Sequence, residues 1–386
     1  MLSTEPCFPE DARNMRNEVS RMPAVDALKA IACVLIVLHH LAFYGPMADI
    51  AKPLMPTLIN GLDVYARMAV QVFLVVSGFL FAAKFAPHGV ASIKAPLTLL
   101  LQRYTRLVVP YSAALLLAVC CSAVAGIWMD HHSVSGAPSL VQLLSHVLLL
   151  HDLVDQEALS AGVWYVAIDF QLFALAVLLL WLPGRFAGRH PWLGAVAPLL
   201  IAGMTIASLF GFNRNVFWDE SAFYFFGAFG LGIMAWWASG RQHASRWLGL
   251  LVMLVVAALA LDFRGRIAIA AGVMLLLGLA RQSGLLHTLP VPAPLLALSR
   301  ISYSVFLVHF PLCLLVNATV TTLFPANPVI NALGLIVALA LSIAGGAQFY
   351  RRIENYPFPN RMRLLFPAGV VAGGWLTALA AANFGG

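Results

Sequence analysis

Long apolar stretches alternate with short polar connections along almost the whole chain. An apolar run of about 20 residues is long enough for a helix to cross the hydrocarbon core of a bilayer. The first run extends from Arg21 to Tyr44, and the others lie near 68–85, 107–127, 162–182, 192–210, 219–238, 247–262, 265–281, 301–324, 328–350 and 365–384. The pattern predicts an all-α fold, a polytopic transmembrane helical bundle with about ten to eleven spans.

The same pattern predicts the domain organisation. Residues 1–24 are polar and are expected to form a cytoplasmic tail, whereas residues 25–350 form the transmembrane domain. Residues 351–386 are predicted to be a cytoplasmic basic loop followed by an additional C-terminal transmembrane helix. Segment 139–151 is too short to span and is interpreted as an interfacial or re-entrant helix.

Composition excludes a soluble protein. Of the 386 residues 61% are hydrophobic and only 10% are charged, which is far too apolar for a water-exposed surface. The expected partner is the lipid bilayer, and the net charge of +7 reflects basic loops on one side and not a nucleic-acid partner. The five cysteines show no paired spacing, so neither a disulfide framework nor a metal site is predicted.

The distribution of basic residues predicts the orientation. With the N-terminus in the cytoplasm, 18 of the 23 Lys and Arg residues fall on the cytoplasmic side, as the positive-inside rule requires. The exceptions on the outer side are Lys52, Arg67, Arg214, Arg264 and Arg266. The longest outer segment, 128–161, contains no Lys or Arg.

The first apolar run contains four polar side chains that hydrocarbon would normally exclude: Asp26, Lys29, His39 and His40. At about 100° per residue, Lys29 and His40 lie within roughly 20° of the same face, and Asp26 lies within roughly 40° of His40. A histidine in such a stripe can act as a general base near neutral pH. The alternative role is an interhelical hydrogen bond, and His39, about 100° away, is expected to be structural or supporting.

Two arginines at the start of the third span form a second group. Arg103 and Arg106 are three residues apart, so they lie on one side of a helix and offer two guanidinium groups to phosphate. Lys84 precedes them and would add to a basic mouth for a polyanionic cofactor such as coenzyme A. Simple anchoring by the positive-inside rule is the alternative explanation.

Four further residues are candidates for the functional site, and for each a purely structural role is the alternative explanation. Ser77 precedes Gly78, a pair that also allows close helix packing. Asp169 follows Trp164 in the fourth span and is either paired within the bundle or lines a cavity. His309 lies in the middle of its span, where an interhelical hydrogen bond is the main alternative.

These pieces, taken in order, resemble the acyltransferase-3 family of bacterial integral-membrane acyltransferases, in the stand-alone form. The matching elements are Lys29 and His40 after Asp-Ala-Leu, Ser77 in Ser-Gly-Phe, the Arg103/Arg106 pair, Trp164 with Asp169, and His309 after Ser-Tyr-Ser. The departures are Lys29 in place of arginine, Gln71 in place of an acid and Asp169 in place of glutamate. These departures bear on the substrate preference of the enzyme more than on the class of protein to which it belongs.

The resemblance implies roles for these residues. His40 would be the catalytic base or a transient acyl carrier, supported by Lys29 on the face that also carries Asp26. Arg103 and Arg106 would bind the acyl-CoA donor, most simply acetyl-CoA. The acceptor would be a glycan or a lipid-linked saccharide, and the location a bacterial cytoplasmic (inner) membrane.

Other functions remain open at the level of sequence. The polar stripe of the first helix also suits a proton-coupled transporter. A non-catalytic membrane assembly protein with the same fold is another alternative. Within the enzyme class the transferred group could be succinyl instead of acetyl, and no feature indicates an oligomeric state.

Overall fold

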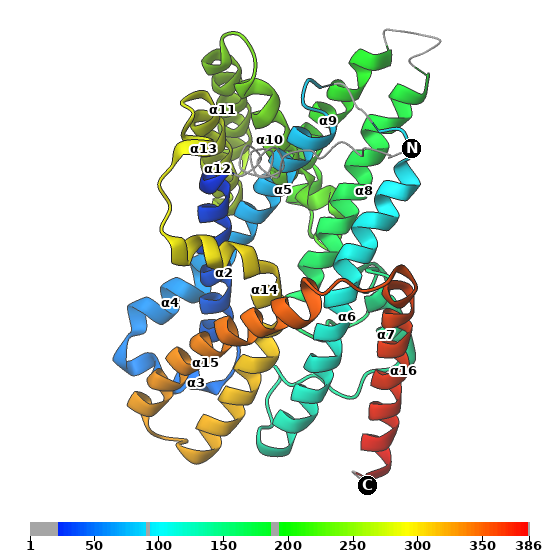
Figure 1. Cartoon of the computed structure of the whole chain (residues 1–386). Coiled ribbons are helices and arrows are strands. Elements are labelled where there is room, and N and C mark those ends of the chain that lie inside the picture. Colours follow the sequence, from blue (N-terminus) through cyan, green and yellow to red (C-terminus); the bar gives the residue numbers. More distant parts are fainter. Residues whose placement is uncertain (1–21, 90–92, 187–192, 385–386) are drawn as a thin grey trace, which may run out of the picture.

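The computed structural model describes residues 22–89, 93–186 and 193–384. Within these ranges all regular secondary structure is helical (Figure 1). The long helices are α2 (Pro23–Phe43), α5 (Val70–Phe85), α6 (Pro96–Trp128), α8 (Val163–Phe186), α9 (Leu193–Phe210), α10 (Ala222–Ser239), α11 (Ala244–Leu261), α12 (Gly265–Gln282), α14 (Ala293–Leu323), α15 (Pro328–Phe349) and α16 (Asn360–Phe384). The short ones are α3 (Pro46–Ala51), α4 (Pro56–Tyr65), α7 (Leu140–Val147) and α13 (Leu285–Thr288).

The described part of the chain contains 10 stretches that are long and apolar enough to cross a membrane. This confirms the predicted polytopic helical bundle. The stretches comprise the long helices other than α16, with α4 and α5 forming one span. Helix α16 packs against α6 and α7 (Figure 1), and its role as an additional span remains a prediction. Most of the expected tail, 1–24, lies outside the described residues.

Proline and polar caps set where several helices begin. Proline occupies the first turn of α2, α3, α4, α6, α14 and α15, where its missing N–H breaks no helical hydrogen bond. The Asn327 side chain accepts hydrogen bonds from the N–H groups of Val329 and Ile330 at 3.1 Å. Ser139 and Gln142 form a capping box at the start of α7. The 139–151 segment is therefore a short helix and not a span.

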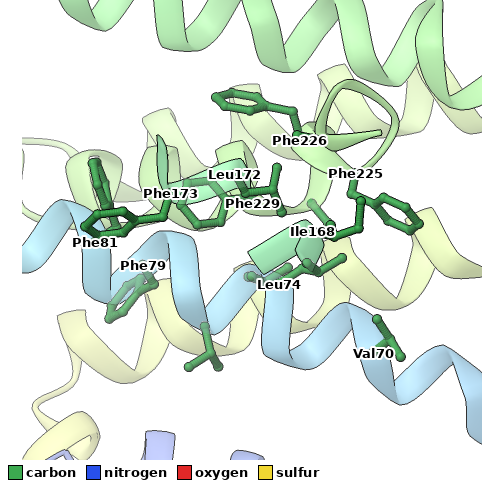
Figure 2. Close-up of a cluster of buried hydrophobic side chains, with 14 of the residues drawn as sticks. Val70, Leu74, Phe79, Phe81, Ile168, Leu172, Phe173, Phe225, Phe226 and Phe229 are labelled. Carbon is green, nitrogen blue, oxygen red and sulfur yellow. The ribbon is translucent and has the colours of Figure 1, made fainter. Parts of the chain in front are cut away.

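Helices α5, α8 and α10 form the aromatic core of the bundle (Figure 2). Phenylalanines from α5 and α10 meet those of α8, with Phe81 packing edge-on against Phe173. The close approach of α5 and α10 depends on two glycines. A Cβ at Gly78 would overlap the Phe229 carbonyl, and a Cβ at Gly232 would overlap the Val75 carbonyl. Small residues allow this approach, as in other membrane helix pairs.

Adding a side chain at this contact should separate the two helices. We expect Gly78→Ala to destabilise the protein by about 1–3 kcal/mol, because the clash is with backbone that cannot rotate away. Gly249 on α11 has nothing within 4 Å of a Cβ, so Gly249→Ala is the matched control. Thermal unfolding in detergent measures both, and equal melting temperatures for the two variants would contradict the close-contact account.

The segment between α6 and α8 contains a buried histidine pair outside the spans. His146 Nδ1 donates to the Gln142 carbonyl at 2.7 Å, and its Nε2 accepts from the Leu159 N–H at 3.1 Å. The ring of His151 stacks on that of His146 with centroids 4.1 Å apart. Burial lowers the pKa of His146 to about 4 and that of His151 to about 3.

This segment should therefore loosen in mild acid. In the unfolded chain these histidines bind protons below their ordinary pKa of 6.5, whereas in the fold they stay neutral until about pH 4, so stability falls as the pH falls through this window. Asp152, whose pKa burial raises to about 6, offsets only part of the effect. Hydrogen exchange across 139–154, corrected for intrinsic rates, should show weaker protection at about pH 5 than at about pH 7. Unchanged protection would contradict the buried neutral pair.

Candidate active site

His40 lies near the end of α2 and makes a direct hydrogen bond to His309 of α14. The distance between His40 Nδ1 and His309 Nε2 is 2.6 Å, and the two rings are nearly parallel at 10°. Both side chains are buried, with exposed fractions of 8% and 0%. The interhelical hydrogen bond considered for both histidines is thus present, and it joins the two to each other.

The hydrogen bonds assign the tautomer of each ring. His309 Nδ1 lies 2.7 Å from the Phe306 carbonyl oxygen, which can only accept, so Nδ1 carries the proton. His309 Nε2 then has a lone pair, and His40 Nδ1–H donates to it. The proton-free nitrogen of His40 is therefore Nε2, the atom that a general base or nucleophile needs.

A cavity of about 670 Å³ contains His40 in its wall. We call it the His40 cavity, and it opens at the end of the bundle opposite the one where α2 begins. Its lining comes from α2, the α4–α5 turn, the loop before α8, the α11–α12 turn and α14. Trp164 lines it, as does His39, whose Nδ1 lies 3.3 Å from the Leu62 carbonyl.

A second cavity, of about 500 Å³, lies toward the end where α2 begins. We call it the Arg103 cavity. Its charged lining residues are Lys29, Arg103, Arg106, Asp169, Arg300 and Glu354. Four cations against two acids make it a basic site. Phe306 lines both cavities and is the side chain at which they approach each other.

Three of the candidate residues form one polar network in the Arg103 cavity. Arg103 and Asp169 form an ion pair, and Ser77 Oγ donates to Asp169 Oδ1 at 3.1 Å. Asp169 is therefore both paired within the bundle and part of a cavity wall. One terminal nitrogen of Arg103 is already bound to the Asp169 carboxylate. Arg106, by contrast, forms no ion pair with any described residue.

The remaining candidates are not gathered in one place. Lys29 lines the Arg103 cavity and His40 lines the other, because eleven residues of helix rise by roughly 16 Å. Asp26 accepts a hydrogen bond from Ser299 Oγ at 2.9 Å and lines neither of the two. Lys84 is exposed at the end of α5 beyond the cavity lining.

Sequence reasoning missed Glu354. The segment Tyr350–Glu354 is a π-helix that continues α15, and it brings Glu354 into the Arg103 cavity, where Ser304 Oγ donates to Oε2 at 2.6 Å. π-helical turns are frequent at functional sites. The available signal was a single acid inside a basic run that was taken for a loop.

The described residues contain no group of three or more His, Cys, Asp or Glu side chains placed to hold a metal ion. Four of the cysteines are free thiols, and Cys7 lies outside the described residues.

The fold and the site define a multi-pass membrane protein with a buried histidine pair, of which His40 lines one of the two cavities. The family model described as an acyltransferase domain matches residues 22–347. The chain belongs to the acyltransferase-3 family, and the protein is a membrane acyltransferase. Comparison with curated proteins and comparison with solved structures each found no match. The matched range includes His40 and His309 but ends before Glu354.

The tautomer assignment makes His309 a positioning residue for His40. His309→Ala should lower kcat about 100-fold with little change in donor affinity, since losing the partner that orients a functional histidine commonly has an effect of this size. His309→Gln supplies a carbonyl oxygen as acceptor and should recover part of the loss. Steady-state kinetics of acyl transfer test this, and equal rates for the Ala and Gln variants would show that His309 does no more than fill space.

Proposed function

We propose that this membrane acyltransferase moves an acetyl group from acetyl-CoA, bound in the Arg103 cavity, to a saccharide hydroxyl in the His40 cavity. The observation that carries the proposal is the arrangement around Phe306. A basic cavity and a cavity containing His40 open toward opposite ends of the bundle and share this side chain. By the positive-inside distribution, the Arg103 cavity faces the cytoplasm, where acyl-CoA is available. The membrane would be a bacterial inner membrane.

Arg106 is the first candidate for the donor phosphates. It lines the Arg103 cavity and forms no ion pair with any described residue, so its guanidinium group would be available to phosphate. Lys29 and Arg300 line the same cavity and add charge. Arg103 keeps Asp169 neutralised and is expected to orient the site more than to bind the donor.

The acyl group then has to pass Phe306 to reach His40. The Phe306 ring packs edge-on against Tyr165 with centroids 5.4 Å apart, and its ring centroid lies 5.9 Å from that of His309. A change in the Phe306 side-chain rotamer would join the two cavities without moving the backbone carbonyl that holds His309. An extended pantetheine arm would carry the thioester through this opening.

At His40 two routes conserve atoms and charge. In direct transfer, Nε2 takes the proton of the acceptor hydroxyl while that oxygen attacks the thioester carbon, the C–S bond breaks, and the CoA thiolate takes the proton back. In the covalent route, Nε2 itself attacks the carbon, the C–S bond breaks and the CoA thiolate leaves. The acceptor hydroxyl oxygen then attacks the acyl carbon, the N–C bond breaks to restore His40, and the CoA thiolate takes the hydroxyl proton. In either route His309 accepts the hydrogen bond from His40 Nδ1–H and so stabilises positive charge on the His40 ring.

Donor binding and transfer should separate in two variants. His40→Ala should bind acetyl-CoA like the wild type and transfer nothing, because the reacting nitrogen is gone. Arg106→Ala should raise the Kd for acetyl-CoA about 10-fold, the value of one charge-assisted phosphate contact. Binding to protein in lipid discs and release of free CoA measure the two steps.

Arg351→Ala is the matched control, since Arg351 is exposed beside the same end of the bundle and is not part of the cavity lining. Normal transfer by His40→Ala would refute the assigned role of His40. Binding of succinyl-CoA in preference to acetyl-CoA would change the donor and keep the mechanism. If neither ester binds, a proton-coupled transporter or a non-catalytic assembly protein becomes the better reading.

A further inference from the structure

The His40 cavity collects basic residues from a side of the membrane where they are scarce. Of the five Lys and Arg residues predicted on that side, Arg67, Arg264 and Arg266 all line this cavity. Membrane topology gives no reason for basic residues here, because the positive-inside rule disfavours them on this side. Their convergence beside a reactive histidine calls for a ligand with negative charge.

The three arginines are not equivalent. Arg264 is committed to the fold, since its Nε donates to Asp262 Oδ2 at 2.7 Å and its terminal nitrogens donate to the carbonyls of Asn213 and Arg214. Its charge is therefore neutralised by a neighbour. These contacts hold the α11–α12 turn, and Arg266 follows two positions later in the chain.

Arg67 and Arg266 differ from Arg264 in lacking a direct carboxylate partner among the described residues. The guanidinium of Arg266 is held over the Tyr224 ring, 5.0 Å from its centroid, which fixes its position and leaves its edge free for hydrogen bonds. Arg67 is exposed at the mouth of the cavity. The acid in the lining is Glu157, itself exposed.

The rest of the cavity suits a sugar. Trp164 supplies an aromatic face, and the hydroxyls of Ser133, Ser135 and Ser160 with the amide of Gln71 supply hydrogen-bonding groups. A volume of about 670 Å³ is in the range of ordinary small-molecule sites. A guanidinium group is suited to carboxylate or phosphate because it can donate two parallel hydrogen bonds.

We infer that the acceptor is an anionic saccharide, whose carboxylate or phosphate binds Arg67 and Arg266 while a nearby hydroxyl lies at His40 Nε2. The inference rests on the proposed function and adds the charge of the substrate to it. The anionic group can belong to an acidic sugar residue or to the phosphate of a lipid-linked saccharide. The shared chemistry is an oxyanion fixed beside the hydroxyl that is acylated.

The test compares three acceptors of matched length: a neutral oligosaccharide, a uronic-acid oligosaccharide and a saccharide linked to lipid diphosphate. Transfer from labelled acetyl-CoA is measured with the wild type and with an Arg67→Gln, Arg266→Gln double variant. The double variant should raise KM for the preferred anionic acceptor about 10-fold to 100-fold, with kcat nearly unchanged. Preference for the uronic acid or for the lipid diphosphate identifies the source of the charge.

Three controls keep the outcomes distinct. Lys52→Gln removes a basic residue on the same side that is exposed and not part of the cavity lining, and it should leave KM unchanged. The Arg67→Lys, Arg266→Lys variant keeps both positive charges. If the Gln double variant is folded and its defect comes from lost charge, the Lys variant should recover much of the affinity. Binding of a fluorescent uronic-acid oligosaccharide without donor gives a readout that does not depend on transfer.

If the wild type binds the anionic saccharide, the Gln double variant does not, and no acyl transfer occurs, the inference is supported and the proposed function is rejected. Efficient transfer to the neutral acceptor, unaffected by the double variant, would keep the proposed function and overturn the inference. Absence of both transfer and binding for all three acceptors would overturn both.

Discussion

The hydrogen bond between His40 and His309 is the interaction on which the site depends. It joins α2 to α14 inside the bundle, where an unpaired imidazole would be costly, and it leaves the remaining lone pair of His40, a residue that lines a cavity, on Nε2. A second contact holds the same helices nearby. Gly45, at φ +94°, ends α2 in a turn where the Asn317 side chain accepts the Met47 N–H at 3.1 Å. Together they fix the depth at which chemistry can occur.

The charges are divided between the two cavities in a way that suits two different anions. In the Arg103 cavity one arginine is matched by Asp169 and another is left without an ion-pair partner among the described residues. The His40 cavity repeats this arrangement, with Arg264 matched by Asp262 and Arg266 left unmatched. In each, one arginine is held by a carboxylate and another lines the cavity without an ion pair to a described residue. Phe306 stands where the two meet.

Hydropathy was sufficient to predict the helical bundle, because the bilayer requires each span to satisfy its own backbone. Helical periodicity placed Lys29 and His40 on one stripe, and the helical rise separated them by roughly 16 Å. The two different cavities that they line became visible only in the structure. Contacts between distant segments were beyond sequence reasoning. The His40–His309 bond joins residues separated by 269 positions, and Glu354 reaches its cavity only because α15 continues as a π-helix.

In the proposed reaction, donor and acceptor meet His40 from opposite faces of the membrane. The most direct test uses sealed vesicles of known orientation, with membrane-impermeant acetyl-CoA on the face where α2 begins and the saccharide acceptor on the other. The account predicts acetylated saccharide in this arrangement, none when the two compartments are exchanged, and none with His40→Ala. Product formed only when donor and acceptor share one face would contradict the account, because the two cavities would then serve no common reaction.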